Sequence, residues 1–235
     1  MFKNCLRKVD IETIDVPEEV GEYADQVMEQ MFNTETLYIP SYGYMKSQPD
    51  INEKMRAILI DWLIEVHFKF KLLPETLFIT VNLIDRYLEV SQVVRHKLQL
   101  LGVTAMWIAC KYEEIYAPEI KDFVYITDNA YKQKDILDLE YEVLRTLEFN
   151  VTTPSSYRFL HRFAKLLRAD QKTLNLAWYL IELPLIEYKM LKYKPSIISA
   201  AAIFVAFRML KKEIKPSFAV TSYTEQQIKP CAKDL

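Results

Sequence analysis

Glycine is scarce in this sequence, with only 3 in 235 residues. Tight turns and loops that cradle phosphate groups both depend on glycine, because it adopts backbone angles that other residues avoid. The scarcity therefore argues against a β-rich fold with many hairpins. It also argues against a nucleotide site built on a glycine-rich loop.

An excess of charge of either sign is also missing. The chain carries 30 basic and 32 acidic residues, mixed along its length, for a net charge of −2. Proteins that bind nucleic acid usually gather Lys and Arg into a patch or stripe. No such footprint is present, so we expect no nucleic-acid partner.

Cysteine is rare and scattered, at Cys5, Cys110 and Cys231. An odd set without metal-ligand spacing predicts neither a zinc site nor a disulfide framework. The first eight residues lack the apolar core of a signal peptide, and no uncharged stretch is long enough to span a bilayer. We therefore expect a reducing location, in the nucleus and cytoplasm, and no membrane partner.

The sequence also lacks the residue patterns of catalytic sites. The histidines, His67, His96 and His161, are far apart, and no phosphate loop, nucleophile elbow or zinc-protease motif occurs. Glu113 and Glu114 form a carboxylate pair, but neighbours on a helix diverge by ~100°. From the residue pattern alone, we expect both carboxylates to lie in solvent at the end of a helix. We expect no catalytic residue, no metal and no cofactor.

What the sequence does contain is helical periodicity almost throughout. Hydrophobic residues make up 51% and charged residues 26%, a globular composition. Residues 1–16 show little pattern, and 33–50 are irregular. The spacing of apolar residues predicts a first helix from Pro17 to about Phe32. Further helices are predicted from Met55, from Pro74, over Leu98–Ile115, shortly after Pro118, over Lys132–Leu147, Ser155–Leu167 and Thr173–Ile186, and from Pro195.

Two of these predicted helices are apolar on every side, one after Leu98 and one after Pro195. Helices of this kind are buried. Small residues recur in both, since Ala105 and Ala109 are followed 97 residues later by Ala202 and Ala206. The repeat predicts two small helical domains, each around a central buried helix. Residues 150–154 would link them.

Two features are open to more than one interpretation on pattern alone. The stripe Met55–Leu59–Trp62 follows one helix face, and such stripes usually belong to the core. Lys111 directly follows a buried run, and Glu140 lies in a different predicted helix. Charges at the margin of buried helices form either ion pairs or interfaces, and the pattern favours neither.

Four segments resemble a known family, the A- and B-type mitotic cyclins. Met55–Glu65 is similar to the opening helix of the cyclin box, and Lys111–Pro118 with Phe123–Asp128 resembles later parts of it. Gly43–Asp50 resembles the segment before the box. The resemblance runs from about Tyr23 to the C-terminus, where Glu225–Leu235 matches only the start of the last family helix.

The resemblance implies an all-α fold of two tandem five-helix cyclin-box domains preceded by an N-terminal helix. The expected divisions are a lead-in tail (1–16), the N-terminal helix and linker (17–50), and the two boxes (51–150 and 151–235). It also implies a function: a non-enzymatic regulatory subunit that forms a heterodimer with a cyclin-dependent serine/threonine kinase. Such a subunit activates the kinase and recruits Arg-x-Leu-containing substrates and inhibitors, controlling G2/M or S/G2 progression.

Roles for individual residues follow from the resemblance. Arg56 and Asp85 would form an ion pair between the first two helices of the box. Family members use a Lys–Glu pair to hold the kinase's mobile helix inward, so that the kinase's own Lys–Glu pair forms. The expected kinase-binding residues are Lys111, Glu140, Tyr112, Glu114, Leu144 and Val27. The expected substrate-docking groove comprises Met55, Ile58, Leu59, Trp62, Glu65, Leu98 and Gln99.

For the stripe, the resemblance favours an exposed groove, with Met55, Leu59 and Trp62 outward and Ile60, Leu63, Ile64 and Val66 filling the core. Two rival functions remain at this point. Cyclin boxes also occur in general transcription factors that bind DNA, which the balanced charge disfavours. The second rival function is that of a helical enzyme, which no catalytic residue pattern supports.

The subclass is left open by the sequence. B-type members carry a basic phosphate pocket, for which His161 fits one position, whereas Leu174 and Trp178 stand where basic residues are expected. Glu65 is the A-type choice, but Ile60-Asp61-Trp62 is more B-type. Mitotic cyclins also carry a destruction signal in an N-terminal tail. The tail here is short, so either this chain is trimmed or it is degraded by another route.

Overall fold

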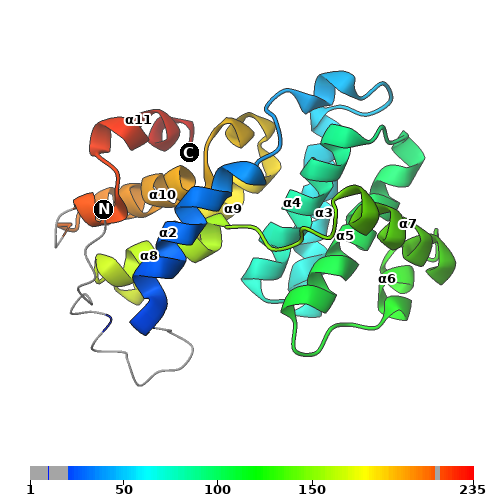
Figure 1. Ribbon diagram of the computed structural model, residues 1–235, viewed down its shortest axis with the longest axis horizontal. Coiled ribbons are helices and arrows are strands. Elements are labelled where there is room, and N and C mark those ends of the chain that lie inside the picture. The colour runs from blue at the N-terminus through cyan, green and yellow to red at the C-terminus, as the bar shows by residue number, and fades with distance from the viewer. Residues whose placement is uncertain (1–9, 11–20, 215–217) are drawn as a thin grey trace.

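The computed structural model describes residues 10, 21–214 and 218–235. Within these residues the chain forms ten α-helices, joined by short 3-10 helices, and no strand, which confirms the all-α class (Figure 1). The predicted start of the first helix at Pro17 lies outside the described residues. Its described part is η2 (Gly21–Tyr23) and α2 (Ala24–Thr34), followed by η3 (Glu35–Leu37) and η4 (Tyr44–Ser47).

A first group of five helices is built around α5, which is one of them. Asn52 caps the first of them, because its side chain accepts a hydrogen bond from Met55 N at 3.0 Å. Pro74 begins the second, a position where its missing N–H costs nothing. The group comprises α3 (Glu53–Phe70), α4 (Pro74–Val90), η5 (Arg95–Lys97), α5 (Leu98–Glu113), α6 (Ile120–Ile126) and α7 (Gln133–Thr146).

A second group surrounds α10. It comprises α8 (Ser156–Leu166), α9 (Gln171–Ile186), η6 (Tyr188–Lys192), α10 (Pro195–Met209), η7 (Phe218–Thr221) and α11 (Glu225–Asp234). Ala105 and Ala109 on α5, like Ala202 and Ala206 on α10, are completely buried. Small side chains let neighbouring helices approach both central helices closely, as the repeat predicts. In the described part of the chain, the second group has four α-helices where the first has five.

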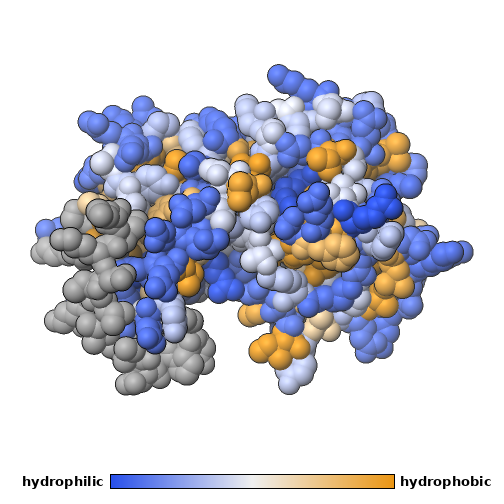
Figure 2. Space-filling view, in the orientation of Figure 1, coloured by the Kyte–Doolittle hydropathy of each residue, from blue (hydrophilic) through white to orange (hydrophobic). Residues whose placement is uncertain are grey.

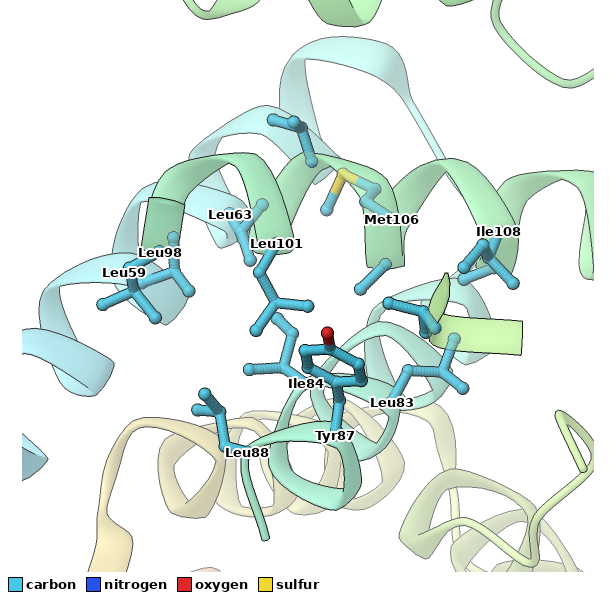
Figure 3. Close-up of a cluster of buried hydrophobic side chains, with 14 of the residues drawn as sticks. Leu59, Leu63, Leu83, Ile84, Tyr87, Leu88, Leu98, Leu101, Met106 and Ile108 are labelled. Carbon is cyan, nitrogen blue, oxygen red and sulfur yellow. The ribbon is translucent and has the colours of Figure 1, made fainter. Parts of the chain in front are cut away.

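Each group has its own hydrophobic core. The first core lies between α3, α4, α5 and α7, and Figure 3 shows its centre, with Leu63, Leu101 and Met106 among the labelled side chains. The second core lies between α8, α9, α10 and α11, and Phe159 and Phe163 are fully buried in it. The two groups lie side by side in Figure 1, joined by the linker after α7.

Helix α2 packs on the second group, although it precedes the first group in the chain (Figure 1). The Phe32 ring packs against Phe159 at an interplanar angle of 49°, with ring centroids 5.0 Å apart. Just after α2, the Glu35 carboxylate accepts hydrogen bonds from Ser196 N at 3.1 Å and Ser196 Oγ at 2.9 Å. The N-terminal helix is thus a component of the second group's core.

Two sequence-based exclusions can be compared with the described residues. No helix among them is long and apolar enough to cross a membrane. No cluster of three or more potential metal-ligating side chains occurs in that part of the chain. Cys110 and Cys231 are buried free thiols there, whereas Cys5 lies outside the described residues.

Candidate functional site

The structure brings Lys111 and Glu140 together at one end of the first group. Lys111, in the last turn of α5, forms an ion pair with Glu140 of α7. Trp107 Nε1 donates a hydrogen bond to the other carboxylate oxygen at 3.0 Å, and the Lys111 ammonium lies 4.8 Å from the centre of the Trp107 ring. Glu140 is buried, whereas the Lys111 side chain is 42% exposed.

Sequence reasoning missed Trp107. The signal was available, because Trp107 precedes Lys111 by four residues and so lies on the same helix face. Trp107 and Lys111 both bind the Glu140 carboxylate, which is largely shielded from bulk solvent. The pair is therefore pre-assembled before any partner arrives.

Accessible apolar side chains lie on the same two helices as this pair and just beyond their ends. Tyr112 is about half exposed, with its hydroxyl bonded to Thr152, and Leu144 is half-buried. Other large apolar residues are exposed on α7, just after α7 and after α5: Leu137, Tyr141, Phe149, Ile115 and Tyr116. Figure 2 shows hydrophobic residues over the half of the molecule occupied by α3–α7. Exposed apolar patches of this kind usually mark interaction sites.

Val27 lies on a different element from the rest of the predicted kinase-binding set. It is 48% exposed on α2, which packs on the second group. A partner that touches both Val27 and the Lys111–Glu140 pair must therefore span both groups of helices.

Glu113 and Glu114 do not form a solvated helix end, so that pattern-based prediction is wrong. Glu114 accepts hydrogen bonds from Leu73 N at 2.7 Å and Thr76 Oγ1 at 2.6 Å, and so caps the start of α4. Glu113 instead pairs with Arg158 of α8 at 2.8 Å. Because adjacent helical residues diverge, the two carboxylates bind different elements.

A third carboxylate, Glu75, is buried where the two groups meet. It lies in the first turn of α4 and accepts a hydrogen bond from Ser155 Oγ, the N-cap of α8, at 2.8 Å. Arg158 Nε lies 3.6 Å away. Burial raises the pKa of Glu75 to about 7, as does the nearby charge of Glu113, while Ser155 and Arg158 act to lower it.

This carboxyl makes folding pH-dependent. Its pKa rises from an ordinary 4.5 to about 7 on folding, so the folded chain binds the proton more tightly than the unfolded chain. Its contribution to the free energy of unfolding is therefore full below about pH 4.5 and is lost as the pH rises to about 7. The loss is at most about 3 kcal/mol, at 1.36 kcal/mol per pKa unit.

We expect Glu75→Gln to remove this part of the pH dependence, because the amide keeps an acceptor for Ser155 but does not titrate. Urea denaturation of both proteins at pH 5 and pH 7.5 measures it. Glu75→Gln should gain stability relative to the unmodified chain at pH 7.5. An identical pH dependence in the two proteins would contradict the assignment.

Arg56 and Asp85 form a bidentate ion pair between α3 and α4. Arg56 Nε and Nη2 each donate to an Asp85 carboxylate oxygen at 2.6 Å, and Tyr44 Oη donates to Asp85 at 2.7 Å. Both charges are almost completely buried. Burial acts to lower the pKa of Arg56, but the Asp85 carboxylate raises it above its ordinary value, so the guanidinium stays charged.

The same arginine also joins the two groups of helices. Arg56 Nη1 donates to the backbone oxygens of Leu185 at 3.0 Å and Ile186 at 3.3 Å, in the last turn of α9. The last carbonyls of a helix have no partner within it, so Arg56 fills that need. Tyr188 completes the junction, because its hydroxyl accepts hydrogen bonds from the backbone N–H groups of Gly43 and Met45.

Two of the predicted docking-groove residues belong to the core instead. Leu59 is 6% exposed and Leu98 is 5% exposed, and both lie in the first core, where Figure 3 shows them next to each other. Leu59 packs where α5 has a glycine: a Cβ atom at Gly102 would lie 2.8 Å from Leu59 Cδ1. The expectation of an outward-facing Leu59 is therefore wrong.

The remaining groove residues stay accessible. Ile58 is 61% exposed and Glu65 is exposed. Three others are half-buried: Met55, Trp62 and Gln99. These residues form an accessible strip on α3 and the start of α5, and Leu59 and Leu98 lie buried in the same two helices.

His161, which fits one position of the B-type phosphate pocket, has aromatic neighbours. The His161 ring packs against Tyr157 at 4.7 Å and Trp178 at 5.7 Å between ring centres. Leu174 packs against the second core. Tyr157, His161 and Trp178 thus form an aromatic cluster.

Comparisons with known proteins agree with this architecture. The family model described as "Cyclin, N-terminal domain" matches residues 26–152, and "Cyclin, C-terminal domain" matches residues 154–235. Cyclin-B2-2 of Oryza sativa subsp. indica is 47% identical over 229 residues, which cover 95% of this chain and 55% of that protein. G2/mitotic-specific cyclin-B of Dictyostelium discoideum is 43% identical over 232 residues, covering 97% and 53%.

The chain thus spans about half the length of the curated relatives it matches. Among solved structures, a viral cyclin from herpesvirus saimiri superposes with a TM-score of 0.79 at 17% identity. The match covers 88% of this chain and 93% of the viral one. At that identity the match shows the fold alone. These two relatives have B-type or G2/mitotic names, so the chain is more similar to named B-type cyclins than its residues alone indicated.

Proposed function

Since this chain belongs to the cyclin family, we propose that it is a regulatory subunit of a cyclin-dependent serine/threonine kinase. It binds and activates the kinase, helps to recruit substrates and controls progression through G2/M or S/G2. The observation that carries the proposal is the buried Glu140 carboxylate, bound by Lys111 and Trp107, amid exposed apolar side chains.

The geometry suits the capture of a helix from the kinase. Lys111 has three N–H donors, of which Glu140 uses one, so others remain for carbonyl groups at the end of a partner helix. The apolar side chains of Tyr112, Tyr141 and Leu144 supply contact area around this polar centre. Holding that helix inward lets the kinase's own Lys–Glu pair form, which is a condition for phosphoryl transfer.

A reconstitution experiment tests the proposal. The purified chain is mixed with each cyclin-dependent kinase of its own organism, and phosphorylation of a Ser-Pro or Thr-Pro peptide is measured. We expect strong activation with at least one kinase and no turnover by the chain alone. No increase with any of them would overturn the proposal.

The accessible strip on α3 is the proposed docking site for Arg-x-Leu peptides. Ile58 and Trp62 offer apolar contact to the leucine, and Glu65, one turn from Trp62, can pair with the arginine. Gln99 can hydrogen-bond to the peptide backbone. Leu59 and Leu98 are buried in the first core, so substitutions at those two positions would damage that core.

We expect Ile58→Ala with Trp62→Ala to abolish binding of a fluorescent Arg-x-Leu peptide, measured by anisotropy. Glu65→Gln should weaken binding modestly and reduce its dependence on salt, because exposed ion pairs are screened. Kinase activation measured on a peptide without the motif should persist in all variants. Undiminished binding by the double variant would place the peptide elsewhere.

Leu59→Ala is the structural counterpart to these variants. It should lower the free energy of unfolding by about 2–5 kcal/mol, the usual cost of truncating a buried leucine. Thermal melts distinguish this loss of stability from the loss of peptide binding expected for Ile58→Ala with Trp62→Ala.

The buried thiols of Cys110 and Cys231, unpaired with any disulfide partner, support a further part of the proposal, that the protein acts in the reducing nucleus and cytoplasm. A fluorescent fusion in cells of the source organism tests it.

A further inference from the structure

A cavity of about 100 Å³ lies where the two groups of helices meet, partly open to solvent. Its walls come from η3 and the segment after it, from α3 and α4, from the linker at 153–155, from the end of α9, from η6 and from α10. Ligand pockets favour such junctions between domains. Neither the proposed kinase-binding surface nor the proposed docking strip includes it.

The wall is mainly apolar. Its hydrophobic lining includes Pro40, Phe78, Val81, Leu185, Met190 and Ile198. An apolar cavity of comparable kind, about 150 Å³ and lined by Leu, Ile and Phe, is known to bind benzene. A cavity of about two thirds that volume with an open side suits a compact ring whose substituent points to solvent.

The charged groups on the wall are already matched within the protein. Arg56 is bound by Asp85 and by two carbonyl oxygens of α9, and Asp85 also accepts from Tyr44. The Glu35 carboxylate is bound by Ser196, and burial raises its pKa. A charged ligand would lose its hydration without gaining an unpaired counter-charge, which is costly.

From the size, lining and charge balance of this cavity, we propose that it is a binding site for small uncharged single-ring molecules. An occupant touches the N-terminal segment and both groups of helices at once. It therefore favours the arrangement in which all three are packed together, by mass action on the folded state.

Phenol is the probe, with benzoate and benzylammonium as charged counterparts of similar ring size. The full chain is labelled with 13C at the methionine methyl groups. Met190 lines the cavity and is 2% exposed, whereas Met106 is fully buried in the first core and does not line it. The Met190 resonance is assigned with Met190→Leu, and that of Met106 with Met106→Leu.

We expect phenol to shift the Met190 resonance in a saturable manner, with a dissociation constant on the order of 1 mM, and to leave Met106 unchanged. Benzoate and benzylammonium should produce at least a tenfold weaker effect. No saturable shift at Met190 would overturn the proposal. So would equal shifts at Met106, or equal binding of the charged rings.

A filling variant gives a second, independent readout. Ile198→Phe places a ring into the cavity and should abolish the response to phenol. Ile197→Phe is the matched control, because Ile197 is the neighbouring residue but does not line the cavity. Equal responses of the two variants would contradict the site. The test on the unmodified chain stands even if Ile198→Phe fails to fold, and its outcome is independent of whether any kinase is activated.

Discussion

Arg56→Ala is expected to lower the free energy of unfolding by about 3–5 kcal/mol, the usual cost of breaking a buried ion pair from one side. The change removes both bonds to Asp85 and leaves that carboxylate buried with Tyr44 as its remaining partner. It also leaves the carbonyl groups of Leu185 and Ile186 without their donor. The effect is large because one side chain serves α3, α4 and α9.

Thermal melts and urea denaturation measure this loss. For a chain of this size, each kcal/mol lowers Tm by roughly 2–4 °C, so a fall of roughly 6–20 °C is expected. Arg95→Ala is the matched control. Arg95 is exposed on η5, and its substitution should stay within about 0.5 kcal/mol. Equal stability of the two variants would show that the buried ion pair contributes little.

Glu140→Gln is expected to weaken kinase binding at least about 30-fold, which corresponds to about 2 kcal/mol. The amide keeps an oxygen that can accept from Trp107 Nε1, but it removes the charge that holds Lys111. Because Lys111 is partly exposed, it can be hydrated when its partner is neutral, so the variant should fold normally. The loss should therefore appear in activation and not in Tm.

The measurement is the concentration of the chain that gives half-maximal kinase activation, with circular dichroism as the check on folding. Glu142→Gln serves as the control, since Glu142 lies on the same helix but is bound by Tyr87 on another face. It should activate as the unmodified chain does. If both variants activate equally well, Glu140 does not contact the kinase. If Glu140→Gln unfolds, its role is structural.

The helices and their central pair could be predicted from the sequence because they depend on local periodicity. Apolar residues at steps of three and four identify α3, and the all-apolar runs with alanine at a fixed repeat identify α5 and α10. These signals lie within one helix, or between two similar helices, and need no knowledge of how helices pack.

The burial of Leu59 could not be predicted in the same way. Periodicity shows which face of α3 is apolar. How much of that face is buried depends on the neighbouring helix. Gly102 is a small residue on α5, yet nothing in the sequence pairs it with Leu59, 43 positions away. The contact that buries Leu59 is a tertiary one.

The same limit applies to Arg56. Its partner Asp85 was expected from the family resemblance, whereas its bonds to the end of α9 join residues about 130 positions apart. A basic side chain in the first turn of a helix gives no local sign that it will cap another helix. For the same reason, Glu113 and Glu114 were expected in solvent and are instead bound by α8 and α4.

The packing of α2 on the second group has a consequence for synthesis on the ribosome. Phe32 contacts Phe159, so 127 residues must be added after Phe32 before its ring partner exists. At roughly 5–20 residues per second, that interval lasts roughly 6–25 s. The first group can fold during this time, while the apolar face of α2, with Met28, Met31 and Phe32, stays uncovered. Helix α2 is thus made before the first group but assembled after it, and in the interval its apolar face is exposed to aggregation.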